Sequence, residues 1–318
     1  MVGVLRSKLR TNDFSSKMIE KIKYPLILDG GLSNVLEGFG CDLNNDLWSA
    51  QLLIDQPELI IKAHLAYLRS GAQCITTSSY QASVEGFIKV GLSSEEAENL
   101  MLKSISLAEA AREQYLKETS TNKKIYIAVS LGPYGATLAD GSEYRGNYSI
   151  SEQDLKDFHF QKIQLLGKTK ANFFGFETIP SLMEVKVLAQ LLADSTIPSW
   201  VSFSCKVELH LNDGNRISKA AELLANTASV FAVGVNCTAP KYISAIIDQL
   251  KNAAPKKKII VYPNSGEVYH VQSKSWLGVS DPFSFEKMAL EWRQKGADMI
   301  GGCCRIGTEH IKRIKGLK

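Results

Sequence analysis

The sequence predicts a single-domain (β/α)8 TIM barrel, and three observations support this fold class. Eight short apolar or β-branched runs recur along the 318 residues, and helix-like sequence separates each run from the next. The runs carry almost no charge, which is typical of strands buried on both faces of a parallel sheet. No linker rich in Pro, Gly or Ser divides the chain. We expect one barrel domain over residues 24–318 after an N-terminal extension over residues 1–23, with a doubly wound open sheet as the alternative fold.

The eight runs alternate with helical sequence in the order that a (β/α)8 barrel requires. The expected strands are Leu26–Asp29, Cys74–Ser78, Ile125–Ser130, Phe173–Glu177, Trp200–Ser204, Phe231–Val235, Ile259–Tyr262 and Asp298–Gly301.

Helix start and stop signals lie between these strands. The segment Asp55–Glu58 offers an N-cap, a proline in the first turn and an acid three residues on, and Gly71 is placed to end that helix. Ser93–Glu96 and Ser181–Glu184 open two further helices in the same way, and Gly296 ends the helix before the last strand.

Composition excludes several classes of function. The formal net charge of +4 is small for this length, so we expect no nucleic-acid partner. No apolar run reaches the length of a membrane span, and the polar N-terminal stretch lacks the apolar centre of a secretory signal. Six cysteines are too few for a disulfide framework, which favours free thiols in a reducing compartment and a cytoplasmic location.

Three of the cysteines follow strands of the expected barrel. Cys237 comes after the sixth strand, and Cys303 and Cys304 come after the eighth, so all three are expected at the C-terminal mouth. Three thiolates there can bind one Zn²⁺ and leave a fourth tetrahedral position open, as in a catalytic site. The alternative is that these are buried apolar thiols, which is how we interpret Cys41, Cys74 and Cys205.

Two acids and several aromatic residues are expected at the same mouth. Asp29 and Glu177 end strands that otherwise carry no charge. They are candidates for an ammonium clamp, for acid–base catalysis, or for carboxylates bonded to the next helix's N-terminus. Four aromatic residues lie near mouth loops and either face a cation or fill the core: Trp48, Tyr80, Tyr134 and Tyr262. The polar segment Gly132–Ser149, after the third strand, is expected to fold over the site.

Several motifs together resemble the homocysteine S-methyltransferase family over about residues 24 to 315. They are LILDGGLSNVLE, TTSSYQAS, SLGPYGATLADGSEYRGNY, FETIP, SFSCK, GVNCTAP, YPNSGE and GGCCRIGTEHI. GVNC followed by GGCC is the most specific combination. The chain departs from the family's usual pattern at Ser33–Asn34 and at Lys170–Asn172, away from the thiols and acids. It resembles the stand-alone members, which use S-methylmethionine or S-adenosylmethionine, because no cobalamin or folate module follows the barrel.

The resemblance implies a (β/α)8 barrel with a catalytic zinc held by Cys237, Cys303 and Cys304. It places the amino group of homocysteine near Asp29 and Glu177. It also assigns Trp48 and Tyr80 to the amino-acid pocket, and we add Asn236 to that pocket because it directly precedes the first cysteine.

We therefore expect a zinc-dependent methyl transfer that gives methionine. The thiol of homocysteine would take the open zinc position and attack the methyl carbon of the sulfonium donor. Small molecules are the expected partners. The alternative is a thiol-based zinc or redox sensor; a metal-dependent hydrolase is disfavoured because it would use histidine or carboxylate ligands. The preferred donor, selenium-containing acceptors and the oligomeric state stay open.

Overall fold

Eight parallel strands form a nearly closed barrel in the computed structural model, which describes residues 18–43, 47–270, 275–277 and 281–318. The hydrogen-bonded order is β1-β12-β9-β8-β5-β4-β3-β2, and a parallel bridge between Leu28 and Cys74 joins the two ends of that order. This closure excludes the open sheet. The strands are β1 (Leu26–Ile27), β2 (Cys74–Thr76), β3 (Tyr126–Leu131), β4 (Phe173–Ile179), β5 (Ser199–Phe203), β8 (Val230–Asn236), β9 (Lys258–Tyr262) and β12 (Met299–Ile300).

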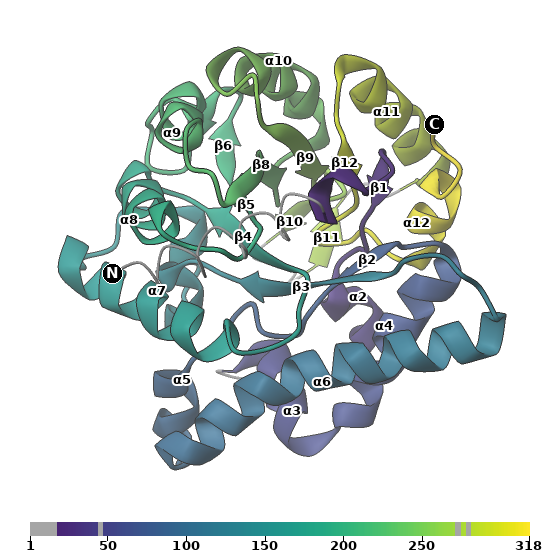
Figure 1. The fold of residues 1–318 in the computed structure, drawn as a ribbon, viewed down its shortest axis with the longest axis vertical. Coiled ribbons are helices and arrows are strands. Elements are labelled where there is room, and N and C mark those ends of the chain that lie inside the picture. The colour runs from purple at the N-terminus through teal and green to yellow at the C-terminus, as the bar shows by residue number, and fades with distance from the viewer. Residues whose placement is uncertain (1–17, 44–46, 271–274, 278–280) are drawn as a thin grey trace, which may run out of the picture.

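Helices surround the barrel (Figure 1), and none of those described is long and apolar enough to cross a membrane. They are α2 (Leu32–Gly38), α3 (Leu52–Asp55), α4 (Pro57–Ser70), α5 (Val84–Lys89), α6 (Ser94–Thr119), α7 (Glu152–Leu166), α8 (Leu182–Ala193), α9 (Ile217–Leu224), α10 (Ile243–Ala253), α11 (Pro282–Lys295) and α12 (Thr308–Ile314). Short 3-10 helices η1 (Trp48–Gln51), η2 (Tyr134–Leu138), η3 (Ser142–Tyr144) and η4 (Pro240–Tyr242) lie in the connections, with two small hairpins, β6–β7 (Cys205–Val207 and His210–Leu211) and β10–β11 (Val268–His270 and Ser275–Leu277).

Most of the expected helix ends are confirmed, and one is wrong. Ser93 and Glu96 form a reciprocal capping box at the start of α6, and Gly71 ends α4 with φ 111°. The N-cap of α4 is Gln56 rather than Asp55. Asp55 instead completes the last turn of α3, where its carboxylate accepts a hydrogen bond from Gln51 Nε2 at 2.6 Å.

Side chains alternate along each strand between the barrel interior and the helix layer, as the period of a strand requires. Leu26, Leu28, Tyr126 and Ala128 belong to the interior cluster, whereas Ile127 and other intervening residues pack against the helices. The interior cluster also contains Ile22, with the partly buried Met18, Ile19 and Tyr24 packed against it. Part of the expected extension therefore contacts the barrel, and the domain boundary at residue 23 stays a prediction.

The barrel interior becomes polar toward the C-terminal ends of the strands. On β3 the inward positions pass from Ala128 to Ser130, and on β4 they pass from Phe173 to Glu177. Ser202 on β5 and Asn236 on β8 continue the same layer, and both are buried. This change of chemistry places the candidate site at the mouth, where such barrels carry their function.

Candidate metal centre and substrate cavity

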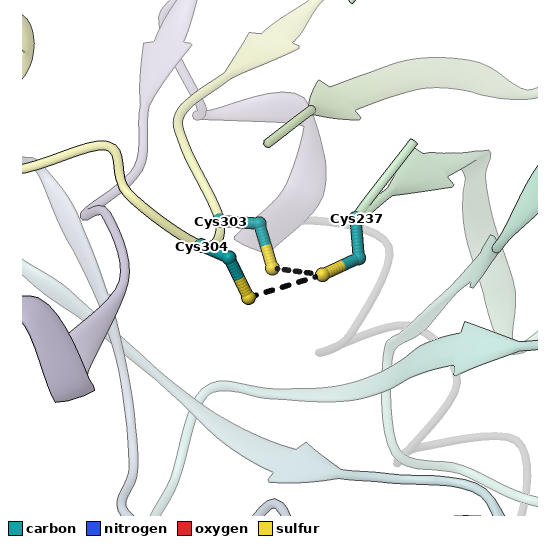
Figure 2. A group of neighbouring side chains, drawn as sticks. All are labelled: Cys237, Cys303 and Cys304. Atoms are coloured by element: carbon teal, nitrogen blue, oxygen red, sulfur yellow. Dashed lines mark hydrogen bonds between the residues drawn. The ribbon is translucent and has the colours of Figure 1, made fainter. Parts of the chain in front are cut away.

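Three thiols meet at the mouth of the barrel. Cys237 Sγ lies 3.0 Å from Cys303 Sγ and 3.3 Å from Cys304 Sγ, and all three sulfurs lie within 4.8 Å of one another. Figure 2 shows the three side chains pointing toward one another, Cys237 from the end of β8 and the adjacent pair from the segment after β12. Strand β9 separates β8 from β12 in the sheet, so the cluster spans the end of that strand.

The local backbone explains how adjacent cysteines reach one point. Cys237 has φ 46°, in the left-handed region, which turns its side chain away from the strand direction. Gly302 allows the chain to pass close to Ile306, because a Cβ atom at Gly302 would lie 2.0 Å from Ile306 Cγ2. The expected bend before the cysteine pair is therefore present, and it depends on the absence of a side chain.

Asn236 links the cluster to β4. Its Oδ1 accepts from the backbone N–H of Thr178 at 2.6 Å and from Ser202 Oγ at 2.7 Å. Its Nδ2 donates to Thr178 Oγ1 at 2.7 Å and lies 3.8 Å from Cys303 Sγ. Thr178 has φ 61°, which is a strained conformation for a β-branched residue, and these hydrogen bonds hold it there.

Hydrogen bonding within the cluster sets the protonation of the thiols. Contacts in which Cys303 donates to Cys237 and Cys304 raise the pKa of Cys303 well above its usual value, with burial as a further cause. The same kind of contact, accepted from Cys237 and Cys303, holds the pKa of Cys304 well below its usual value. The cluster thus favours a negative charge on one sulfur, and the thiolate is the form that binds metals.

Asp29 is a buried carboxyl group just after the end of β1. Its Oδ2 accepts from the backbone N–H of Thr76 at 2.7 Å, and Thr76 Oγ1 lies 3.2 Å from its Oδ1. Burial raises its pKa to about 8, opposed by the hydrogen bond from Thr76, and the charge of Glu177 raises it further. The partner of Asp29 is therefore a strand residue rather than a helix N-terminus.

Glu177 is the second buried acid. Ser130 Oγ donates to its Oε2 at 2.6 Å, and Tyr262 Oη donates to its Oε1 at 3.3 Å. Burial raises its pKa to about 7 in spite of these donors, which lower it. Each carboxylate has about four lone-pair sites, so both acids retain acceptor capacity for a cationic ligand.

The thiols and acids line one cavity of about 100 Å³. Tyr80 and Asn236, which the sequence suggested as substrate-binding residues, also line it, and their contact with a substrate stays a prediction. Trp48 lies in η1, but its side chain falls outside the described residues; its neighbour Ser49 lines the cavity.

Sequence reasoning missed Tyr144. Its hydroxyl lies 3.6 Å from Cys237 Sγ, and its ring lines the cavity. Tyr144 belongs to the segment Gly132–Ser149, which we expected over the site, so the segment was identified but the residue was not. Tyr134, for which the sequence left a cation contact and core packing open, packs against Tyr148 and Phe158.

The donor set fits zinc. A tetrahedral ion with sulfur ligands at about 2.3 Å holds those sulfurs about 3.8 Å apart, which the three Sγ atoms reach with small rotations. The thiols are half-buried, and they face the cavity that holds the acids. Asn236 and Tyr144 supply hydrogen-bonding groups beside two of the sulfurs, as is usual around protein-bound metals.

Comparison with known proteins identifies the family. The family profile described as homocysteine S-methyltransferase matches residues 26–317. The chain is 45% identical to homocysteine S-methyltransferase YbgG of Bacillus subtilis, covering 92% of this chain and 94% of that protein. It is 40% identical to homocysteine S-methyltransferase 3 of Arabidopsis thaliana, covering 96% and 93% of the two chains.

A solved structure agrees in fold and in sequence. The crystal structure of the homocysteine methyltransferase MmuM from Escherichia coli, in its metallated form, superposes with a TM-score of 0.83 at 38% identity, covering 94% of this chain and 98% of that one. Together with the relatives above, this shows that the chain is a methyltransferase enzyme and belongs to the homocysteine S-methyltransferase family.

Proposed function

We propose that this enzyme transfers the methyl group of a sulfonium donor, S-methylmethionine or S-adenosylmethionine, to the thiol of L-homocysteine and so forms methionine. Zn²⁺ is the proposed cofactor, held by Cys237, Cys303 and Cys304. The observation that carries the proposal is the convergence of three sulfurs and two buried acids on one cavity. When bound, zinc supplies a Lewis acid that lowers the pKa of a coordinated thiol.

The two acids provide the recognition of the acceptor's amino group. Asp29 and Glu177 are held by Thr76, Ser130 and Tyr262, which fix where their oxygens point. An ammonium group beside them would favour their charged forms and offset the burial that raises their pKa values. Fixing the amine at this end of the cavity also fixes the direction from which the sulfur approaches the methyl carbon.

The aromatic residues provide an environment for the cationic donor. Tyr80 and Tyr144 line the cavity beside the thiols, and aromatic faces attract sulfonium-type cations as they attract ammonium ions. Tyr262, the other aromatic candidate, has a different role. Its hydroxyl donates to Glu177 and accepts from Trp200 Nε1 at 3.1 Å, so it holds the carboxylate in place. The leaving sulfide is neutral, so the reaction requires no acid from the protein.

A donor panel tests the reaction. The purified protein is incubated with homocysteine and with each sulfonium donor, methionine is measured by mass spectrometry, and bound zinc is measured by elemental analysis. Methionine formation with about one zinc per chain is the expected result. A protein that binds zinc but forms no methionine from either donor would contradict the proposal and favour the sensor function.

Substitution of the thiols tests the metal site. Cys237→Ser, Cys303→Ser and Cys304→Ser are each expected to lose zinc and turnover, because two sulfurs cannot hold the ion tightly. Cys41→Ser is the matched control, since Cys41 is a partly exposed thiol outside the cluster. Retention of zinc and of activity by any of the three cluster variants would overturn the assignment.

The free state of all six cysteines is consistent with the cytoplasmic location that we propose.

A further inference from the structure

The carboxylate of Glu184 lies outside the cavity and holds the loop that covers the cavity. Glu184 lies in the first turn of α8 and is fully buried, yet it does not line the cavity. The sequence suggested that its side chain would complete a capping box with Ser181. Ser181 Oγ does accept from the Glu184 backbone N–H at 3.3 Å, but the carboxylate of Glu184 is directed elsewhere.

That carboxylate bonds to both ends of the loop between β3 and α7. Glu184 Oε1 accepts from the backbone N–H of Tyr134 at 2.9 Å, at the start of η2. Glu184 Oε2 accepts from the hydroxyl of Tyr148, near the end of the loop. His159 Nε2 lies 2.7 Å from Oε1, so a third group, on α7, fixes the same carboxylate. Buried hydrogen bonds to a carboxylate are among the stronger ones.

The loop fastened in this way carries Tyr144 to the thiols. Its two 3-10 turns, η2 and η3, pack against each other, and the Arg145 guanidinium pairs with Asp140 within the loop at 3.1 Å. The loop contacts the site through the Tyr144 hydroxyl, 3.6 Å from Cys237 Sγ. A unit that is rigid within itself moves as a whole if its attachment at both ends is released.

We propose that Glu184 is a positioning residue, which holds the loop of residues 133–149 in place so that Tyr144 covers the cavity beside Cys237. Glu184 touches no substrate in this arrangement and acts through Tyr144. The inference rests on homocysteine S-methyl transfer in this cavity, but not on which donor is used. It assigns a functional role to a residue that local sequence would explain by helix capping alone.

Glu184→Gln tests the attachment with nearly the same side-chain volume. Trypsin cleavage after Arg145 reports directly on the loop, because this exposed residue lies next to Tyr144. We expect the Arg145–Gly146 fragments to appear about tenfold faster in Glu184→Gln, as local opening becomes easier. Glu152→Gln is the matched control: Glu152 accepts from Gln190 Nε2 at 3.3 Å between the same two helices, α7 and α8, but its side chain is exposed and has no hydrogen bond to residues 133–149 in the described structure. Its cleavage rate should equal that of the wild type.

Activity measurements separate positioning from general destabilisation. Glu184→Gln should lower kcat/KM about tenfold through the misplaced loop. In a Tyr144→Phe background the same change should cost less than about threefold, because residues that act as a unit are not additive. An unchanged trypsin rate in folded Glu184→Gln, or losses that multiply fully in the double variant, would overturn the proposal.

A milder variant covers the case in which Glu184→Gln does not fold. Tyr148→Phe removes one of the three groups that bond to the carboxylate and should accelerate cleavage after Arg145 in the same direction, by a smaller factor. Wild-type cleavage kinetics in Tyr148→Phe would then contradict the inference. Because proteolysis needs neither donor nor acceptor, failure of this inference is distinguishable from failure of the methyl transfer itself.

Discussion

Glu177→Gln should weaken homocysteine binding while the metal centre stays intact. Glutamine keeps the shape of the side chain, and its amide can still accept from Ser130 Oγ, which now donates to Glu177 at 2.6 Å. What is lost is the negative charge opposite the ammonium group. A hydrogen bond to a charged group contributes about 1.5–3 kcal/mol, so we expect the Kd for homocysteine to rise about 10- to 150-fold.

Calorimetry with two ligands isolates this interaction. Homocysteine and 4-mercaptobutyrate carry the same thiol and carboxylate, but the second lacks the amine. Glu177→Gln should change the affinity for homocysteine by the factor above and leave the affinity for 4-mercaptobutyrate within about threefold of the wild type. Glu152→Gln, which removes an exposed carboxylate that does not line the cavity, should change neither. Zinc content is measured in every sample.

The pH dependence of homocysteine binding follows from the burial of Glu177 and Asp29. The pKa values are raised to about 7 for Glu177 and about 8 for Asp29, so both groups become charged as pH rises through this range. The affinity for homocysteine, relative to that for 4-mercaptobutyrate, should therefore increase from about pH 6 to about pH 8 in the wild type. It should increase less steeply in Glu177→Gln. An unchanged Kd for homocysteine, or an equal loss for both ligands, would refute the assignment of Glu177 to the amine.

Two further substitutions test the support of the metal centre. Asn236→Ala should lower zinc affinity about 10- to 100-fold, measured by competition with a chromophoric chelator, because it removes a donor near Cys303 Sγ and frees the strained Thr178. Asn172→Ala, at the other end of the barrel, removes an acceptor of the Ile127 N–H and should affect stability but not zinc affinity; equal zinc affinities in the two variants would contradict this role for Asn236. Gly302→Ala should lower the free energy of unfolding by about 1–3 kcal/mol in urea denaturation, since its Cβ would meet Ile306. Gly38→Ala, where a Cβ meets nothing within 4 Å, is the control, and equal unfolding curves for the two glycine variants would count against the packing argument.

The strands were predictable because their physical constraint is local. A strand buried on both faces is apolar throughout, so each of the eight runs is visible in sequence alone. The cysteines and acids were predictable for a related reason: polar residues directly after such runs must lie at the mouth of the barrel. The resemblance to a known family then favoured a metal centre over a set of buried thiols, two alternatives that spacing had left open.

The contacts of the loops were not predictable from sequence in this way. Ser181–Glu184 reads as a capping box, and only the fold shows that the Glu184 carboxylate bonds to Tyr134 and Tyr148, which are 50 and 36 residues distant. The contact of Tyr144 with Cys237 spans 93 residues and depends on two irregular turns. Asp55 was misassigned because α3 and α4 follow each other with a single residue between them, so that a capping pattern coincides with the end of another helix.

The uneven lengths of the strands have a consequence for how this barrel opens. β1 and β12 are each two residues long, whereas β4 and β8 each have seven. The seam formed by β1 and β12 is paired at two positions only; Cys303 and Cys304 project from the end of β12, and Asp29 follows β1. An ion shared with Cys237 would connect this seam to the end of β8, one of the long strands. Loading with zinc should therefore slow amide hydrogen exchange first along β12 and β1; binding of the proposed ion and closure of the barrel would then depend on each other.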